Sequence, residues 1–432
     1  MQPIRQERRD FLKSLAALAL AGPAVAHLTA VEEAFAAELH DVGSLPRSTA
    51  TWEVLRERYL LGPDVVYLNH ASIGTVPRAV HEACVEYMRV CEANPWLYMW
   101  GGAWEEPREA VRSKAAALFG ADPDEVAITH NTTEGFNLLA QGLPLGSGDE
   151  VLFSSMNHDG AGVCWNHHAS KKGYAVRRFD FPVTDVPGLT ADQVVEIYRR
   201  EIRPETRVLV FPHVDNVVGL RHPMAALAAM ARQEGVEFVA VDGAQTAGML
   251  PLDLNASGVD AYCTSPHKWI QSPKGLGLLY IRRETLESVH PMWVTWGQRR
   301  WAGSARMFED YGTRNLAELL SMGDALDFQR ALGQDDKVER YREIRANLKT
   351  RVDADASLSW QSSEEWELGA SLIGIGFEGP AANALSRSMY SERRIVLRPF
   401  QTQGLNALRI SPNTVTSEAE IDALFAALEA RD

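Results

Sequence analysis

Short hydrophobic runs alternate with amphipathic stretches between about residues 104 and 281. Apolar residues recur at helical spacing in residues 104–119, after Asn131 and in residues 223–234, which Gly235 follows as a stop signal. The segments between them are short and rich in branched and aromatic residues, which is typical of buried strands. We expect strands at residues 126–130, 150–154, 174–180, 207–213, 236–242, 260–264 and 276–281.

Strands that alternate with helices indicate an α/β fold, in which helices cover both faces of a mostly parallel sheet. After Leu316 the pattern changes to long helices that end near Asp355, and a smaller α/β segment closes the chain. We therefore predict a large domain at residues 65–300 and a smaller domain at residues 301–432, with residues 45–64 joining the smaller one. In such sheets ligands bind beyond the carboxyl ends of the strands.

The first 36 residues predict an export signal and leader rather than a part of the fold. Arg8 and Arg9 precede Phe-Leu-Lys, and an apolar run fills residues 14–26. This arrangement resembles the twin-arginine signal, which carries folded proteins to the periplasm. Small residues predict cleavage after Ala26 or after Ala36. The apolar run is too short to span a bilayer, so we expect a periplasmic protein without stable membrane association.

Composition narrows the classes of function. The chain of 432 residues is 46% hydrophobic and 23% charged, which excludes a disordered protein and supports a large core. A formal net charge of −14 disfavours nucleic acid as a partner. The four cysteines show neither a CxxC pair nor a zinc-binding spacing, so we expect free thiols and no metal site.

Four polar clusters follow the predicted strands. Alone, each has an ordinary reading as a helix cap, a turn or a surface lysine. Together they bring hydroxyl groups at a helix N-terminus, where a phosphate binds well, next to a carboxylate and a lysine. The clusters are Thr132 and Thr133 after residues 126–130, Asn216 after residues 207–213, Asp242 and Gln245 after residues 236–241, and Ser265, His267 and Lys268 after residues 260–264.

One string makes a family resemblance specific. Residues 264–269 (TSPHKW), followed by residues 273–277 (PKGLG), resemble the lysine motif of class V aminotransferase-fold enzymes. This pyridoxal phosphate family includes cysteine desulfurases, kynureninases and isopenicillin N epimerase. Further segments are similar in the family's order, namely residues 156–158, 213–219, 308–314 and 408–422. The resemblance covers nearly all of the chain after residue 65. It implies a fold type I enzyme with a seven-stranded sheet, and a homodimer with shared active sites.

The resemblance also implies the roles of individual residues. Lys268 would bond to the cofactor aldehyde and move protons at the substrate α-carbon, Asp242 would pair with the ring nitrogen, and Arg409 would clamp the substrate carboxylate. The remaining residues would bind the cofactor: Asn216 and Gln245 at the ring oxygen, His158 on the ring face, and Thr132, Thr133, Ser265, His267 and Thr313 of the second chain at the phosphate.

The reaction is less determined than the cofactor. Residues 397–407 lack the nucleophilic cysteine of cysteine desulfurases, whereas residues 67–74 are similar to the opening motif of isopenicillin N epimerase-like proteins. That subgroup has twin-arginine-exported members, one of which tailors a siderophore. We predict an exported enzyme acting at the α-carbon or amino group of an amino acid moiety, within a peptide-like metabolite or siderophore.

Several alternatives remain open. One is a C–S lyase without the cysteine, and another is a non-catalytic binding protein of the same fold. Racemisation, transamination, decarboxylation and elimination all begin on the same bond to the cofactor, so the sequence does not separate them. A hydrolase or dehydrogenase is disfavoured because the chain has no G-x-S-x-G, Walker or G-x-G-x-x-G motif.

Overall fold

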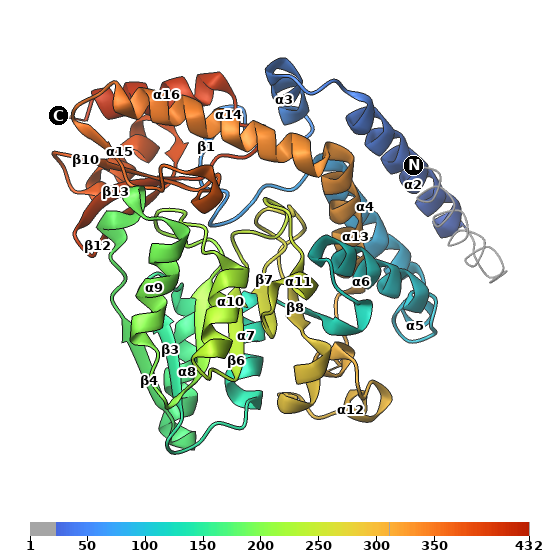
Figure 1. The fold of residues 1–432 in the computed structure, drawn as a ribbon. Coiled ribbons are helices and arrows are strands. Elements are labelled where there is room, and N and C mark those ends of the chain that lie inside the picture. Colours follow the sequence, from blue (N-terminus) through green and yellow to red (C-terminus); the bar gives the residue numbers. More distant parts are fainter. Residues whose placement is uncertain (1–22, 311, 432) are drawn as a thin grey trace.

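A seven-stranded sheet forms the centre of the larger part of the molecule (Figure 1). The computed structural model describes residues 23–310 and 312–431, so the predicted twin-arginine pair lies outside the described residues. The strand order is β2-β8-β7-β6-β5-β3-β4, and β8 runs antiparallel to both neighbours. The predicted α/β class and the seven strands are confirmed. Their bounds are β2 Val126–Thr129, β3 Glu150–Ser154, β4 Ala175–Phe179, β5 Thr206–Pro212, β6 Phe238–Asp242, β7 Ala261–Thr264 and β8 Gly277–Ile281.

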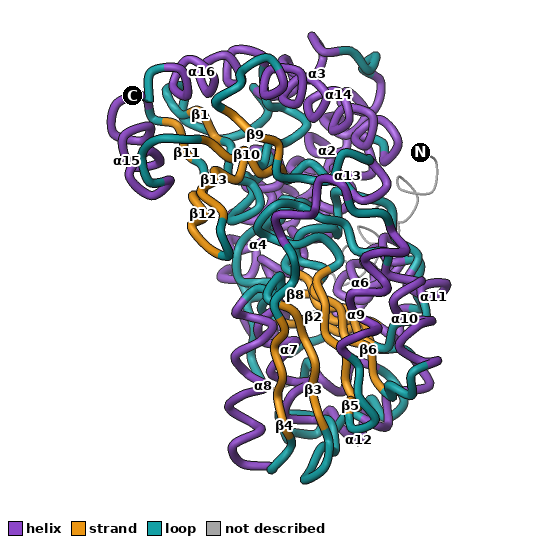
Figure 2. Tube along the Cα trace, turned by 60° about the vertical axis from the view of Figure 1, so that its left-hand side comes forward, coloured by secondary structure: helices purple, strands orange, loops and turns teal. Residues whose placement is uncertain are grey.

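Both faces of this sheet are buried, as the continuous apolar strands require. Figure 2 shows α7 and α8 on one side of the sheet and α9 and α10 on the other. Alternate residues of β5 pack in two separate cores on the two faces of the sheet: Val208 lies in one core and Leu209 in the other. The helices around the sheet are α6 Glu105–Phe119, α7 Thr132–Gly142, α8 Asp159–Lys172, α9 Ala191–Glu201, α10 Met224–Gln233 and the short α11 Leu254–Ser257.

The smaller part contains a four-stranded antiparallel sheet of order β12-β13-β10-β9. Its strands and helices are β9 Leu358–Trp360, β10 Ile373–Phe377, β11 Ile395–Val396, β12 Arg398–Thr402, β13 Leu405–Ile410, α15 Ala382–Arg393 and α16 Glu418–Glu429. The long helices α13 (Leu316–Leu332) and α14 (Gln334–Asp353) connect it to the larger part (Figure 1). The predicted long helices after Leu316 are confirmed.

The N-terminal segments pack differently from the predicted domain boundaries, which join residues 45–64 to the smaller domain and begin the large domain at residue 65. Strand β1 (Val66–Tyr67) pairs in parallel with β11, and Leu68 packs in the core of the smaller part. By contrast, Trp52 and Leu55 of α3 (Thr49–Arg56) pack in a core that they share with the larger part. The difference arises because residues 66–68 run along the small sheet before the chain enters the large one.

A long helix lies ahead of these segments. Helix α2 (Pro23–Ser44) packs on α4 (Arg78–Ala93) and α13, and it buries Phe35 and Val42. Among the described residues, the structure contains no helix with the length and apolar character that a membrane span needs. All four cysteines are free thiols, as the sequence predicted.

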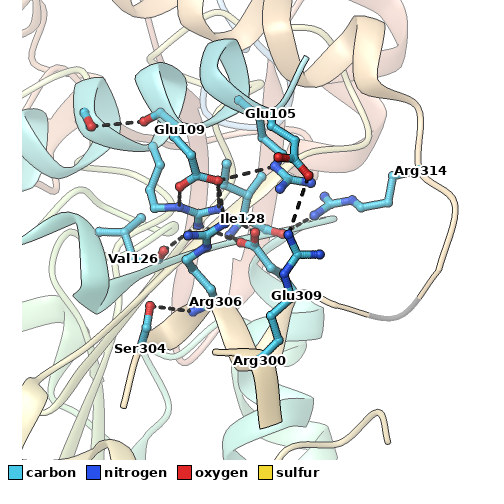
Figure 3. A network of polar contacts seen from close by, with 12 residues as sticks. Glu105, Glu109, Val126, Ile128, Arg300, Ser304, Arg306, Glu309 and Arg314 are labelled. Carbon is cyan, nitrogen blue, oxygen red and sulfur yellow. Dashed lines mark hydrogen bonds and ion pairs between the residues drawn. The ribbon is translucent and has the colours of Figure 1, made fainter. Parts of the chain in front are cut away.

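The Trp/Arg-rich stretch before α13 contains the short helix α12 (Gly297–Arg300) and is anchored on β2, the edge strand of the large sheet. Glu309 accepts hydrogen bonds from both terminal nitrogens of the buried Arg112 (2.8 and 2.5 Å) and from the backbone N–H of Ile128 (2.6 Å). Arg314 donates to the carbonyl of Ile128 at 2.5 Å (Figure 3). These contacts cover part of the open strand edge, which would otherwise invite further strand pairing.

Candidate active site

A polar cavity of about 300 Å³ lies beyond the carboxyl ends of β5, β6 and β7. These ends are level with one another, because Pro212 pairs with Asp242 and Asp242 pairs with Cys263. The structure thereby brings together nine of the predicted site residues. Those lining the cavity are Thr132, Thr133, His158, Asn216, Asp242, Gln245, Ser265, His267 and Lys268.

Lys268 lies on a tight loop directly after β7. Burial, opposed by the nearby Asp242 and assisted by the positive charges of Arg409 and Arg398, lowers the pKa of Lys268 to about 8. A neutral amine is the form that adds to an aldehyde, so this environment suits a nucleophilic lysine. Gly74 lies against the loop: its N–H donates to the carbonyl of His267 at 2.9 Å, and a Cβ there would lie 1.9 Å from the carbonyl oxygen of Lys268.

Asp242 is the last residue of β6; it lines the cavity, and 6% of the residue is exposed. Its Oδ1 accepts a hydrogen bond from the N–H of Ala244 at 3.0 Å, which fixes the orientation of the carboxylate. The next residue is glycine because the Tyr262 ring packs there, and a Cβ on Gly243 would lie 1.9 Å from it. A carboxylate held in this way can pair with a protonated ring nitrogen.

The N-terminus of α7 forms the candidate phosphate end of the cavity. The side chain of Asn131 caps the helix by accepting from the N–H of Glu134. The Thr132 and Ser265 hydroxyl oxygens lie 2.7 Å apart, which joins the helix start to the lysine loop. Free N–H groups and the helix dipole favour an anion at this position. Burial, together with the charges of Lys268 and Lys274, lowers the pKa of His267 to about 4, so this imidazole is neutral at pH 7.

Three further predicted residues surround the space between these groups. His158 caps α8, and its Nδ1 accepts from the N–H of Gly160 at 3.0 Å. Burial is also the main cause that lowers the pKa of His158. The Gln245 side chain donates to the carbonyl of Ala71 at 2.8 Å and accepts from the Trp269 indole N–H at 3.0 Å. Asn216 is also part of the cavity wall.

Arg409, on β13, reaches this wall from the smaller part. It is 2% exposed and donates to Asn69 Oδ1 (2.9 Å), Ser72 Oγ (2.6 Å) and the carbonyl of Asn216 (2.8 Å). Burial and the charge of Arg398 lower the pKa of Arg409 to about 9. All three acceptors are neutral, so no carboxylate compensates the guanidinium charge through these hydrogen bonds.

The sequence analysis assigned no role to three residues that shape the site. Asn69 and Ser72 belong to the opening motif at residues 67–74, which was noticed as a resemblance without a role. Asp215 was also overlooked. It is fully buried, and its carboxylate accepts from the N–H groups of Val217 (2.6 Å), Val218 (2.9 Å) and Leu220, which shapes the loop that presents Asn216. Burial, opposed by these bonds, raises the pKa of Asp215 to about 6.

Thr313 does not line the cavity of its own chain. It is exposed, next to Arg314, on the segment anchored to β2. Its predicted contact with the phosphate in a second chain stays a prediction.

A buried hydrogen-bond chain supports the lysine loop from behind. Lys337 on α14 is 1% exposed and donates to the carbonyl of Gly248 (3.0 Å) and to Gln329 Oε1 (3.1 Å). Gln329 donates to Gln271 Oε1 at 2.7 Å, and the Tyr59 hydroxyl donates to the same oxygen at 2.9 Å. Burial lowers the pKa of Lys337 from 10.5 to about 7. A neutral amine has two N–H groups, which matches the two acceptors.

Replacement of Lys337 by methionine should change how stability depends on pH. The folded protein favours the neutral amine and the unfolded chain binds a proton up to about pH 10, so wild-type stability gains from this group as pH rises from about 7. Between pH 7 and 9 the gain is about 2 kcal/mol, and Lys337→Met should lack it. The midpoint of thermal unfolding at the two pH values measures this. Lys349→Met on the same helix is the control, and equal pH dependence in wild type and Lys337→Met would contradict the prediction.

The fold and this cavity define a pyridoxal phosphate-dependent enzyme of fold type I. The model of the family described as Aminotransferase class-V matches residues 66–421, and the chain belongs to this family. It is 31% identical over 404 residues to isopenicillin N epimerase of Streptomyces clavuligerus, and this match covers 89% of this chain and 99% of that protein. It is 32% identical over 311 residues to a cysteine desulfurase of Klebsiella pneumoniae, covering 67% and 73% of the two chains.

Solved structures show the same fold. A C-DES mutant with glycine covalently linked to its pyridoxal phosphate cofactor matches with a TM-score of 0.79 and 24% identity, covering 87% of this chain and 99% of that one. The cysteine desulfurase CsdA of Escherichia coli matches with a TM-score of 0.75 and 25% identity, covering 90% and 99%. The family uses pyridoxal phosphate, as the sequence predicted.

The described residues fit this cofactor. Lys268 with its lowered pKa, the hydroxyls at the start of α7 and the carboxylate of Asp242 lie around one cavity, and they are the groups that an aldehyde, a phosphate and a ring nitrogen need. When bound, the cofactor supplies an electron sink for charge at the substrate α-carbon. Lys268 would hold the aldehyde carbon, Asp242 would keep the ring nitrogen protonated, and Thr132 and Ser265 would bind the phosphate.

Proposed function

We propose that this protein is an epimerase-like or aminotransferase-like enzyme that acts at the α-carbon or amino group of an amino acid moiety. The observation that carries the proposal is that Lys268 and Asp242 line one cavity, while Arg409 donates to Ser72 and Asn216 of its wall. Arg409 would orient the substrate carboxylate, and Lys268, once released by the incoming amine, would move a proton at the α-carbon. Lys268 suits proton transfer because a pKa of about 8 is close to physiological pH.

The similarity extends over 99% of isopenicillin N epimerase, which favours a reaction at the α-carbon of an amino acid moiety within a peptide-like molecule. A C–S lyase reaction is the second candidate, because a cystine C–S lyase, C-DES, shares the fold. A persulfide route through a protein thiol is not supported. None of the four cysteines lines the cavity, and burial raises the pKa of Cys263, which lies on β7.

Incubation of the cofactor-loaded enzyme with amino acids and short peptides in deuterated water tests the function. We expect the α-proton to exchange with solvent, which mass spectrometry and proton NMR detect, and chiral chromatography and keto-acid assays then identify the product. Formation of cysteine persulfide, pyruvate and ammonia from cystine, without exchange in other amino acids, would replace this function by C–S lysis. Absence of both, with the cofactor bound, would favour the non-catalytic binding protein.

We also propose that the enzyme is exported folded, with its cofactor inside, by the twin-arginine route. The paired Arg8 and Arg9 support the route, and the packing of α2 supports cleavage after Ala26. Cleavage after Ala36 would remove the buried Phe35, which is 3% exposed. N-terminal sequencing of periplasmic protein should therefore begin at His27. A sequence beginning at Ala37 would contradict this site, and export of a variant with lysines at positions 8 and 9 would contradict the route.

A homodimer completes the proposal. The exposed Thr313 lies on a segment fixed to the sheet edge, where it could reach a second chain. Sedimentation should give twice the monomer mass. Thr313→Ala should weaken cofactor retention during dialysis without changing that mass. A monomer in solution would remove Thr313 from the phosphate site.

A further inference from the structure

A second cavity, of about 340 Å³, lies at the start of α10, on the side of the large sheet opposite to α7 and α8 (Figure 2). The chain just after β5 separates it from the candidate active site. Pro212 and Val214 line the active-site cavity, whereas His213 between them lines the second one. Among the described residues, none lines both cavities. A volume of this size is enough for a small molecule.

Arg221 is the positively charged residue of this second cavity. Burial lowers the pKa of the two histidines in its lining, His213 and His222, to about 3, so both are neutral at pH 7. The side chain of Arg221 is half-buried and forms no hydrogen bond or ion pair with the described residues. Its backbone is fixed, because its N–H donates to the carbonyl of Leu368 at 2.8 Å. The cavity wall therefore holds a guanidinium charge without a direct partner.

Two carboxylates line the same cavity. Glu367 is exposed on the short 3₁₀ helix Trp366–Leu368 of the smaller part. Burial lowers the pKa of Arg221 and the charge of Glu367 opposes this shift, yet the two side chains form no ion pair. Asp253 caps α11 by accepting from the N–H of Ala256 at 3.0 Å. Opposite charges that influence each other without meeting leave room for a ligand that carries both signs.

The remaining wall suits the other parts of such a ligand. Helix α10 starts at the cavity after Pro223, and no side chain caps it. The first N–H groups of a helix have no partner within it and favour a negative charge, which adds to the attraction of Arg221. Met224, Pro251 and Leu252 give the cavity an apolar surface.

We propose that this cavity binds a small zwitterionic amino acid with a compact apolar side chain. The carboxylate would bind Arg221 and the start of α10, and the ammonium group would bind Glu367, with Asp253 adding negative charge nearby. Two carboxylates in the wall disfavour a phosphate dianion, and a simple carboxylic acid would leave both of them without a counter-charge. This site is separate from the cavity of Lys268 and does not rest on the proposed function.

NMR of the cofactor-loaded enzyme with ¹³C-labelled methionine methyl groups tests the proposal at the cavity itself. The chain has 11 methionines, and loss of one signal in Met224→Leu assigns Met224. The probe is L-proline, because a secondary amine cannot form the neutral imine that a primary amine forms with the cofactor. Cyclopentanecarboxylate lacks the amine of proline, and pyrrolidine lacks the carboxylate.

We expect L-proline to shift the Met224 signal in a saturable way. The two analogues should bind at least about 10-fold more weakly, as the loss of one charge-assisted contact implies. Arg221→Gln and Glu367→Gln should each weaken L-proline by about the same factor. Both side chains are free of hydrogen bonds and ion pairs within the described chain, so the variants should fold. Arg387→Gln, which removes an exposed charge from α15, is the control and should bind like wild type.

Three results would overturn the inference. The first is a Met224 signal that L-proline does not shift. The second is equal binding of L-proline and cyclopentanecarboxylate, which would make the cavity a simple carboxylate site. The third is a shift that survives in Arg221→Gln and disappears in Arg409→Ala, which would report binding at the active-site cavity.

Discussion

Lys268→Ala should abolish turnover and should leave the cofactor bound only non-covalently. The amine of Lys268 lines the cavity, and its lowered pKa, about 8, makes the neutral, nucleophilic form available near neutral pH. Loss of a positioned proton-transfer group alone costs about 10²- to 10⁴-fold in rate, and loss of the covalent link adds to this. We expect α-proton exchange to fall by at least about 10³-fold.

Spectroscopy and peptide mapping measure the covalent part of this prediction. Borohydride reduction of the wild-type enzyme should fix the cofactor on the peptide that contains Lys268, and the absorbance of the bound cofactor should change in Lys268→Ala. Lys274→Ala is the matched control, because Lys274 is an exposed lysine of the same loop. Recovery of the label on Lys274, or a fully active Lys268→Ala enzyme, would contradict the assignment.

Arg409→Ala should raise KM for substrates with a free α-carboxylate. The guanidinium is buried and its acceptors are neutral, so the substrate carboxylate would be its counter-charge. Truncation of one partner of a buried charge pair costs about 2–5 kcal/mol, which corresponds to about 30- to 5,000-fold in kcat/KM. Arg409→Lys should recover only part of this loss, because lysine cannot form the bidentate contact.

A structural role of Arg409 would give a different result. The side chain also joins the opening motif to the Asn216 loop, so its removal could disturb the cavity as a whole. Substrate amides, which lack the carboxylate, separate the two effects. If Arg409 binds the carboxylate, the loss appears with the acids and is small with the amides. Equal losses with both classes would make Arg409 a positioning residue.

The sequence predicted the fold and the main site residues well, for local reasons. The seven strands were found because each is a short apolar run, and β3 matches its predicted bounds of residues 150–154. The start of α7 was predicted because Asn131 is a capping residue in front of an apolar helical face. Lys268 and Asp242 were found because the TSPHKW string and the strand-ending aspartate resemble the family's motifs, and because strand ends of a parallel sheet meet at one edge.

Contacts between distant segments were not predictable in this way. Asn69 and Ser72 reach Arg409 across 340 and 337 positions of the sequence. The pairing of β1 with β11, the antiparallel direction of β8 and the three bonds of Asp215 likewise follow from how the segments pack. The adjacency of Arg398 and Arg409 depends on the register of one strand pair, which a shift of one residue would destroy.

The amino-acid sequence alone thus determined the order of the elements, the family and the chemistry of Lys268 and Asp242, because caps, apolar runs and motifs act over a few neighbouring residues. Only the tertiary structure decided the environment of these groups. Burial sets the lowered pKa of Lys268 and of Lys337, and it leaves Arg409 charged among neutral acceptors. Desolvation and electrostatic interaction depend on which segments meet in space, and no local pattern of residues records that.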